Sequence, residues 1–304
     1  MRAALQKRRA KLPAGTDTFR WVDEAELTVD LFGEVAVAST YRERPEAEEL
    51  ELAASLLTAG ALHAVYWKRR PREARRSANE EAEYVSPRAP FAGTPVEALT
   101  AKECGLSFSI RPANGLSVGL YLDARDARSW VRERSRGRTV LNVFAYTCGF
   151  GVAALAGGAN RAVNVDASRK VLDWGEENVR LNGFVPERRD FISGDAREWL
   201  GRLGKKGETF GLIVLDPPSF ASVGKTRWSA ATQYPELVRE AVACLEPGGL
   251  LLACCNLEKW NAKEFRAAVQ AGAPGAKVID QFGASAVDFA QPSSFKAVAL
   301  RRSP

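Results

Sequence analysis

The chain has 304 residues, of which 46% are hydrophobic and 26% are charged, and its formal net charge is +6. This length suffices for one large or two smaller domains with a buried core, and no apolar run approaches the ~20 residues that span a bilayer. The basic start, residues 1–9, lacks the apolar segment and cleavage site of a secretory signal, so we expect a cytoplasmic protein with no membrane partner.

The cysteines and the single histidine exclude several kinds of site. No two of the cysteines form a CxxC pair, and their number is odd: Cys104, Cys148, Cys244, Cys254 and Cys255. This usage favours reduced thiols and argues against a disulfide framework or a zinc site, so no metal is expected. His63 lies in an apolar stretch, where a histidine is more often structural than catalytic, so a hydrolytic triad is also disfavoured.

Residues 1–111 predict a small α+β domain. Strand-like runs occupy residues 19–22, 27–31 and 35–38, and residues 45–58 carry apolar side chains at helical spacing. Tyr66 and Trp67 then lead into a basic run that begins with Lys68, Arg69 and Arg70. Positive charges beside aromatic rings predict a surface that contacts RNA phosphates; the alternative is a solvated loop.

Residues 112–304 alternate between strand and helix patterns. The predicted strands are residues 139–144, 162–166, 191–195, 212–215, 249–255, 276–279 and 295–300, and helices are expected at about 167–181 and 235–245. Alternation at this spacing predicts an α/β fold with a doubly wound, mostly parallel, seven-stranded Rossmann-like sheet.

Acidic residues end three of these strands, namely Asp166, Asp195 and Asp216. Ligands of such sheets lie outside the carboxyl ends of the strands, so Asp166 is placed for ribose hydroxyls and Asp195 for an adenine amino group. The loop 147–151 has only two glycines and lacks the G-x-G-x-x-G of a pyrophosphate site. S-adenosyl-L-methionine, which has ribose and adenine but no phosphate, is therefore the expected cofactor. For any one of these acids the alternative is a helix N-cap.

The most informative motif in the chain is Asp216-Pro217-Pro218-Ser219-Phe220, which comes directly after the apolar run 212–215. Each proline lacks a backbone N–H, so the carbonyls at this point are not consumed by a regular ladder. An acid that orients, a carbonyl that accepts and a ring that stacks predict a pocket for a planar, amino-bearing base.

Three segments, residues 115–128, 141–149 and 216–220, resemble the bacterial 23S ribosomal RNA methyltransferases, and in particular the branch with large-subunit cytosine-C5 and guanine-N7 enzymes. The similarity is strong from about Gly115 to Gly249 and weaker before it. Short segments at residues 16–20, 29–33 and 66–71 are similar to parts of the small α+β domain that precedes the catalytic domain in that family.

The resemblance implies site roles at matching positions only. Arg125 would approach the carboxylate of the cofactor, with Asp123 and Arg128 on the same helix, although these could simply be exposed helix charges. The positions implied to surround S-adenosyl-L-methionine are Arg125, Asn142, Phe144, Tyr146, Thr147, Cys148, Gly149, Asp166, Ala167, Asp195, Ala196 and Asp216. The target base would meet Asp216, Pro217, Pro218, Phe220 and Asn256.

The expected mechanism of methyl transfer depends on whether a cysteine stands at the nucleophile position after the strand 249–255. Methylation of cytosine C5 requires a thiolate that first attacks C6, whereas guanine N7 needs little more than alignment with the donor. By the resemblance the nucleophile position falls on Asn256, and Cys255 is one residue short, which reverses the direction of a strand side chain. We therefore expect an RNA methyltransferase that acts by direct transfer, guanine-N7-like, on a flipped base of 23S ribosomal RNA. The alternatives are a cytosine-C5 enzyme using Cys255, a methyltransferase of a non-RNA substrate, or a non-catalytic RNA-binding protein.

Overall fold

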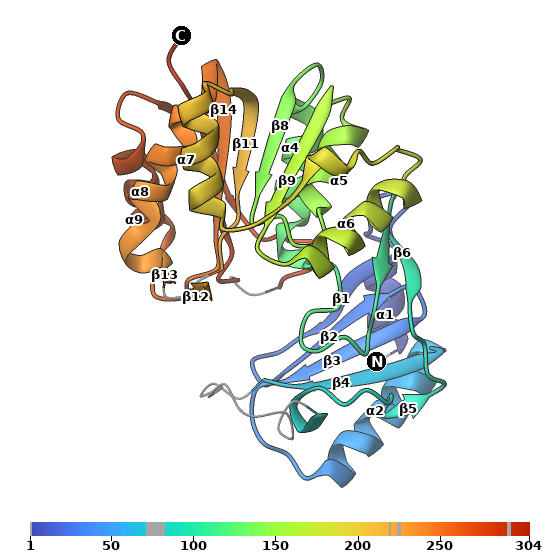
Figure 1. The fold of residues 1–304 in the computed structure, drawn as a ribbon. Coiled ribbons are helices and arrows are strands. Elements are labelled where there is room, and N and C mark those ends of the chain that lie inside the picture. The colour runs from blue at the N-terminus through green and yellow to red at the C-terminus, as the bar shows by residue number, and fades with distance from the viewer. Residues whose placement is uncertain (1, 71–82, 219, 224–225, 291–292) are drawn as a thin grey trace. The chain divides into compact units, whose positions relative to one another are not determined.

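The computed structural model describes residues 2–70, 83–218, 220–223, 226–290 and 293–304. The chain divides into two compact units (Figure 1). The N-terminal unit comprises Met1–Leu122 with Ser285–Gln291, and the C-terminal unit comprises Asp123–Ala284 with Pro292–Pro304. The sequence-based division into residues 1–111 and 112–304 did not indicate the segment 285–291, which returns to the N-terminal unit.

The N-terminal unit is built on a five-stranded sheet with the order β1-β2-β3-β4-β5. β1, β2 and β3 form an antiparallel meander, and α2 connects β3 to the parallel strand β4. The elements of this unit are α1 (Arg2–Arg9), β1 (Thr18–Asp23), β2 (Leu27–Phe32), β3 (Val35–Thr40), α2 (Glu46–Gly60), β4 (Ala64–Arg69), β5 (Ala92–Gly93), β6 (Leu99–Glu103) and β7 (Leu106–Ile110). The predicted strands and helix of this region are therefore confirmed to within a few residues. His63 is exposed rather than buried, because it precedes β4 instead of lying inside it.

The C-terminal unit holds a seven-stranded sheet with the order β10-β9-β8-β11-β14-β16-β15. All neighbours pair in parallel except β16, which is antiparallel to both β14 and β15, so the predicted mostly parallel sheet is confirmed. Its strands are β8 (Thr139–Val143), β9 (Arg161–Asp166), β10 (Phe191–Ser193), β11 (Phe210–Leu215), β14 (Leu245–Cys255), β15 (Lys277–Gly283) and β16 (Lys296–Arg301). The order reverses between β8 and β11, which is the point where such sheets place their ligands.

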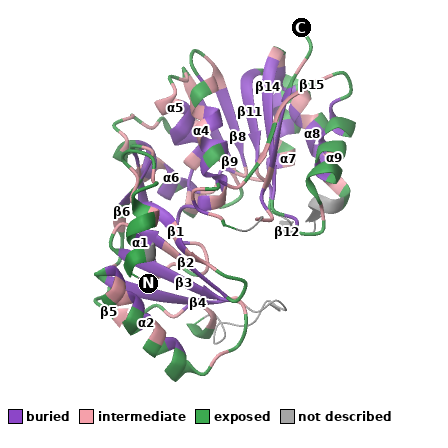
Figure 2. Ribbon diagram, turned by 180° about the vertical axis from the view of Figure 1, so that it is seen from behind, coloured by how far each residue is buried: buried purple, intermediate pink, exposed green. Residues whose placement is uncertain are grey.

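Helices cover both faces of this sheet (Figures 1 and 2). One core lies between the strands and α4 (Arg125–Arg134) and α5 (Gly149–Ala156); the other lies under α7 (Ala196–Lys206), α8 (Ala230–Ala243) and α9 (Ala262–Gly272). Because both faces are covered, β11 is buried along its whole length and reads as an uninterrupted apolar run. α6 (Arg169–Leu181) packs beside α5, and β12 (Phe220–Val223) and β13 (Thr226–Ser229) form a separate hairpin. α8 begins before Pro235, where the sequence had predicted its start.

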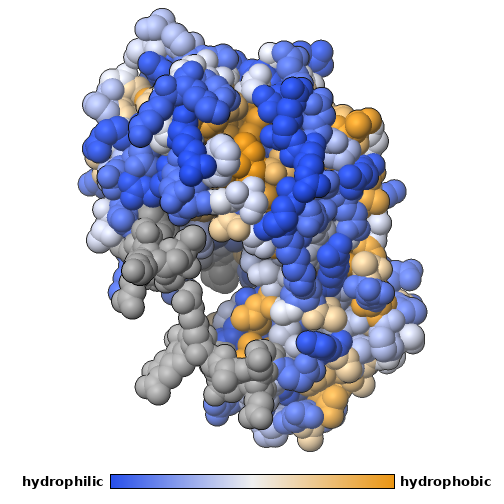
Figure 3. All heavy atoms as spheres, in the orientation of Figure 1, coloured by the Kyte–Doolittle hydropathy of each residue, from blue (hydrophilic) through white to orange (hydrophobic). Residues whose placement is uncertain are grey.

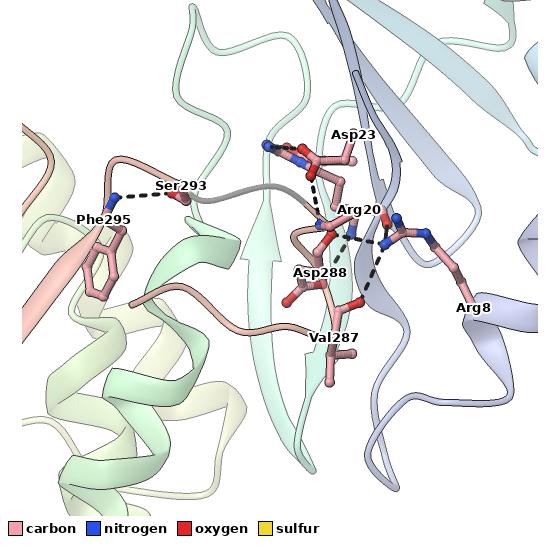
Figure 4. A network of polar contacts seen from close by, with 9 residues as sticks. Arg8, Arg20, Asp23, Val287, Asp288, Ser293 and Phe295 are labelled. Carbon is pink, nitrogen blue, oxygen red and sulfur yellow. Dashed lines mark hydrogen bonds and ion pairs between the residues drawn. The ribbon is translucent and has the colours of Figure 1, made fainter. Parts of the chain in front are cut away.

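The described part of the returning segment, residues 285–290, is held in the N-terminal unit by a polar network (Figure 4). Asp288 is fully buried, and its Oδ1 accepts the backbone N–H of Arg20 at 3.2 Å. The Arg8 guanidinium donates to the carbonyl oxygens of Asp288 at 2.9 Å and Arg20 at 3.0 Å. Asp23 accepts the backbone N–H of Ala290 at 2.9 Å. A buried carboxylate with such partners fixes the segment, since its desolvation is compensated by hydrogen bonds.

Candidate active site

Four neighbouring strands of the C-terminal unit end at the same level. In the register of the sheet, Leu215 of β11 pairs with Val143 of β8, and Val143 pairs with Val165 of β9. Asp166 is paired in turn with Ser193 of β10. The predicted residues Phe144, Asp166, Asp195 and Asp216 therefore stand at or just beyond the carboxyl ends of adjacent parallel strands, at the edge that the topology assigns to a ligand.

The loop between β8 and α5 has an unusual backbone. Phe144, Tyr146 and Cys148 have φ angles of 62°, 48° and 61°, which L-residues other than glycine seldom adopt. Asp166 helps hold this shape, because its Oδ2 accepts the Tyr146 N–H at 2.9 Å while its Oδ1 accepts the Ser168 N–H at 2.9 Å. Strained backbone that is held in place by its surroundings is typical of ligand sites.

Two residues that the sequence did not single out support this loop from α6. The side-chain amide of Asn178 donates to the carbonyl of Thr147 at 2.9 Å. Gly175 allows α6 to approach Cys148: a Cβ at this glycine would lie 2.2 Å from the Cys148 Sγ. Thr147 and Cys148 are buried, so the part of the predicted cofactor loop that reaches solvent is Phe144, Tyr146 and Gly149.

Asp195 is the N-cap of α7. Its Oδ1 accepts the backbone N–H groups of Arg197 at 2.9 Å and Glu198 at 3.0 Å. The alternative offered by the sequence, a helix cap, is thus present in the structure. The cap uses one carboxylate oxygen; Oδ2 accepts no hydrogen bond from the residues that the structure describes, and it can still accept from a ligand.

Asp216 follows the last residue of β11 and is partly exposed. Burial and the nearby Asp123 carboxylate raise the pKa of Asp216 to about 7, against the opposing effect of the Arg128 guanidinium. Asp123, Arg128 and Asp216 therefore form one electrostatic group. Arg125 and Arg128 are buried, so the interpretation of these two arginines as exposed helix charges is wrong. Pro217 is buried, whereas Pro218 is exposed.

Asn142 lies one position inside the end of β8 and is fully buried. Its side-chain amide donates to Oδ1 of Asn164 on β9 at 2.9 Å. Gly151 of α5 leaves room for this pair, since a Cβ there would lie 2.3 Å from the Asn164 Oδ1. Asn142 thus joins two strands at a point where α5 packs against them, and its predicted contact with a cofactor stays a prediction.

The end of β14 separates the two cysteines from the asparagine that follows. Cys254 and Cys255 are buried, while Asn256 is exposed. Burial raises the pKa of the Cys255 thiol, and this effect is opposed by the Leu257 N–H, which donates to Sγ at 3.3 Å, and by Lys296. Burial and the Asp216 and Asp123 carboxylates raise the pKa of Cys254 further. Neither thiol is thus poised as a thiolate nucleophile.

The remaining predicted site residues divide by exposure. Ala167, after β9, is exposed, and Ala196, the first residue of α7, is buried. Phe220 is the first residue of β12, and its side chain lies outside the described part of the structure, as does Ser219 as a whole. The stacking role expected for Phe220 stays a prediction.

The basic run of the N-terminal unit is largely buried. Lys68 is 0% exposed and its Nζ donates to the Ser86 hydroxyl at 2.7 Å; burial and the nearby Arg70 charge lower its pKa to about 8. Arg69 is 7% exposed and pairs with the buried Glu49. Arg70 donates to the Ser39 hydroxyl at 3.2 Å and the Leu116 carbonyl at 2.6 Å. These contacts argue against Lys68 and Arg69 as phosphate contacts, because neither charge faces solvent. The rest of the run, residues 71–76, lies outside the described residues.

The carboxylates at the strand ends can be compared with the polar groups of the expected cofactor. Asp166, Asp195 and Asp216 present carboxylate oxygens at one edge of the sheet, and carboxylates repel phosphate groups but accept hydrogen bonds from hydroxyl and amino groups. S-adenosylmethionine carries ribose hydroxyls, an adenine amino group and a positive sulfonium, and it has no phosphate. The residues present therefore fit this nucleoside.

No helix within the described ranges is both long and apolar enough to cross a membrane. In the same part of the chain, no group of three or more acidic, cysteine or histidine side chains is arranged to hold a metal ion.

The seven-stranded, mostly parallel sheet has the Rossmann-like fold of methyltransferases, and comparison with known proteins agrees. The family model described as S-adenosylmethionine-dependent methyltransferase matches residues 12–290, and the chain belongs to this family. The description of this family names S-adenosylmethionine as the cofactor and methyl transfer as the reaction of its members.

Curated relatives carry more specific names than the family description does. The chain is 40% identical over 166 residues to ribosomal RNA large subunit methyltransferase I of Aeromonas salmonicida, covering 54% of this chain and 42% of that protein. The protein of the same name from Photobacterium profundum is 34% identical over 208 residues, covering 66% and 52%. The chain thus spans about half the length of these relatives.

Solved structures share the fold at low identity. The structure of SMU.776 complexed with SAH has a TM-score of 0.85 at 22% identity and covers 99% of this chain and 80% of its own. A tRNA m1G37 methyltransferase of M. jannaschii has a TM-score of 0.62 at 14% identity, covering 99% and 76%. These likenesses concern the fold alone.

Proposed function

We propose that the protein transfers the methyl group of S-adenosylmethionine directly to a base of large-subunit ribosomal RNA, with a guanine-N7-like acceptor. The names of the curated relatives support the RNA substrate, in agreement with the resemblance of residues 115–128, 141–149 and 216–220. The observation that carries the choice of chemistry is the burial of Cys255 together with the exposure of Asn256 at the end of β14.

When bound, S-adenosylmethionine supplies an electrophilic methyl group on a sulfonium. Asp166 would accept hydrogen bonds from the ribose, and the free Oδ2 of Asp195 would accept one from the adenine amino group. The loop 144–149 would contact the amino-acid part. These groups hold the donor at the switch point between β8 and β11, and alignment with the acceptor then accounts for much of the rate.

Asp216 would orient the target base. With a pKa of about 7, its carboxyl is present in both protonation states near neutral pH. The protonated form donates a hydrogen bond to a ring nitrogen or carbonyl oxygen of a base, and the ionised form accepts one from an amino group. An acceptor atom with a lone pair and no proton, such as guanine N7, needs no general base. The protein would therefore act by positioning rather than through a covalent intermediate.

The test is methyl transfer from isotope-labelled S-adenosylmethionine to purified 23S ribosomal RNA, followed by mass spectrometry of the nucleosides. We expect 7-methylguanosine as the labelled product, and less of it from the Asp166→Ala variant at S-adenosylmethionine concentrations that do not saturate that variant. Label in 5-methylcytidine that disappears in Cys255→Ala would replace direct transfer with the covalent route. Label in protein or small molecules but in no RNA would overturn the RNA substrate altogether.

A further inference from the structure

Tyr84, in the N-terminal unit, is an aromatic side chain that the sequence analysis did not single out. Its side chain belongs to a residue that is 53% exposed, among the most exposed large hydrophobic residues of the described chain. Tyr66 and Trp67, which the sequence had placed beside the basic run as possible partners of RNA, are instead buried in β4. The exposed ring in this region is therefore Tyr84.

A guanidinium group holds the Tyr84 ring in place. The Arg69 Cζ lies 4.3 Å from the centre of the Tyr84 ring, and Arg69 Nη1 donates to the Tyr84 carbonyl oxygen at 2.7 Å. One side chain thus contacts both the ring and the backbone of Tyr84. Because a planar guanidinium stacks on the face of an aromatic ring, it covers one face of Tyr84 and leaves the exposed area to solvent.

The Arg69 side chain is itself held by Glu49 and by an aromatic ring. Its Nε donates to Oε2 of Glu49 at 2.9 Å, its Nη2 contacts the same oxygen, and Glu49 is 1% exposed. The Arg69 Cζ also lies 5.3 Å from the centre of the Phe91 ring. Phe91 in turn stacks on Trp67 with ring centres 5.7 Å apart and an interplanar angle of 4°. Tyr84 is therefore the outer end of a row of planar groups, Trp67, Phe91, Arg69 and Tyr84, that is anchored in the core.

A rigid aromatic ring with one covered and one accessible side is the usual platform for an unpaired nucleobase. Base stacking accepts any base because every base has a π-face, and a ring that is already ordered loses little entropy on binding. Arg88 lies in the same short stretch: its backbone N–H donates to Glu83 at 2.8 Å, and its exposed guanidinium pairs with the same carboxylate at 3.7 Å. Because an exposed ion pair contributes little free energy, Arg88 could exchange this carboxylate for a flanking phosphate. The face of the molecule drawn in Figure 3 is mostly hydrophilic, with apolar patches among the polar side chains.

We propose that Tyr84, in the N-terminal unit, is a stacking platform for an unpaired base of single-stranded RNA. The proposal rests on the proposed RNA substrate and deepens it. It assigns the contact with RNA to an aromatic side chain held by Arg69, and it gives the buried Arg69 a positioning role in place of the direct phosphate contact expected from the sequence.

The test compares two RNA probes with the full chain by fluorescence anisotropy. One is a labelled oligouridine of about 12 nucleotides, within the span of single-strand sites; the other is a ribose-phosphate chain of the same length without bases. We expect wild-type protein to prefer the base-bearing probe. Tyr84→Leu should weaken binding of that probe roughly 5- to 150-fold, which corresponds to one stacked base, and leave the abasic probe unaffected. Tyr84→Phe, which keeps the ring, should bind as wild type.

The salt dependence separates stacking from charge. Tyr84→Leu should leave the slope of log affinity against log salt unchanged, whereas Arg88→Gln should lower that slope by up to about one and weaken both probes equally. Urea midpoints of all three variants provide the folding control. If Tyr84→Leu binds each probe as tightly as wild type does, and the protein still methylates RNA, the stacking platform alone is overturned. A wild-type protein that neither binds nor methylates RNA would instead overturn the proposed function.

Discussion

The backbone N–H of Tyr146 donates to Oδ2 of Asp166 at 2.9 Å, which ties the loop after β8 to the end of β9. The same carboxylate accepts the Ser168 N–H through its other oxygen. Asp166 therefore holds a loop residue with a φ of 48°, and each of its oxygens has a further lone pair that can accept from a ligand.

Asp166→Ala should weaken binding of S-adenosylmethionine at least tenfold. The variant loses the acceptor proposed for the ribose, and hydrogen bonds to a charged group contribute about 1.5–3 kcal/mol each. Isothermal titration calorimetry measures the change. Asp166→Asn, which retains one acceptor oxygen for the loop N–H, is the matched control and should lose less affinity. Wild-type affinity in the alanine variant would remove the ribose assignment.

Asp195 allows its two roles to be separated. Asp195→Ser keeps an oxygen that can cap α7 but removes the second carboxylate oxygen, so it should preserve stability and weaken S-adenosylmethionine binding. Asp195→Ala removes the cap as well and should lower the free energy of unfolding by about 0.5–2 kcal/mol. Urea unfolding and calorimetry on both variants give the comparison. If the serine variant binds the cofactor like wild type, Asp195 is a cap and nothing more.

Asp216 predicts a pH dependence of stability with a definite sign. Its pKa is about 7 in the folded protein and near its ordinary value of 3.8 in the unfolded chain. Between these values the folded state binds the proton and the unfolded state does not. The stability that the protonated group contributes is thus complete below about pH 4 and is lost as pH rises to about 7.

Asp216→Asn mimics the protonated acid and cannot ionise. The difference in unfolding free energy, variant minus wild type, should therefore rise between pH 5 and pH 8. Urea unfolding at these two pH values measures it, and subtraction removes the contribution of all other carboxylates. A difference that stays constant or falls would show that Asp216 ionises freely in the folded protein.

Much of the fold could be predicted from periodicity. The apolar runs of β8, β9, β11 and β14, separated by helical segments, determine a parallel sheet because both of its faces must be covered. The return of residues 285–291 to the N-terminal unit could not be predicted, because it depends on the long-range partners of Asp288, namely Arg8 and Arg20.

The candidate site was predicted where a residue's position along the chain determines its position in space. Asp166, Asp195 and Asp216 follow strands, so their place at one edge follows from topology. Burial within a strand could not be predicted in the same way: Asn142 and Lys68 are polar residues whose partners, Asn164 and Ser86, come from elsewhere in the chain. Tyr84 was missed because the group that contacts its ring, the Arg69 guanidinium, is held by an ion pair to Glu49 that only the fold brings together.

Cys255→Ala should leave methyl transfer largely intact. Burial raises the pKa of this thiol, so little thiolate is present at neutral pH to attack a base. Cys244→Ala, at another buried cysteine whose pKa is raised by burial, is the matched control for any loss of packing. Turnover of labelled S-adenosylmethionine on ribosomal RNA is the measurement. Loss of turnover in Cys255→Ala but not in Cys244→Ala would establish the cytosine mechanism.

Substitution by alanine should change the free energy of unfolding in opposite directions at two helical glycines. A Cβ at Gly175 would lie 2.2 Å from Cys148 Sγ, so Gly175→Ala must displace the loop before α5 and should cost about 1–3 kcal/mol of stability. Nothing lies within 4 Å of a Cβ at Gly201 in α7, so Gly201→Ala should stabilise by up to about 1 kcal/mol through helix propensity. Urea unfolding measures both. Because the displaced loop carries Tyr146, Gly175→Ala should also weaken S-adenosylmethionine binding, and unchanged binding would show that the loop does not contact the cofactor.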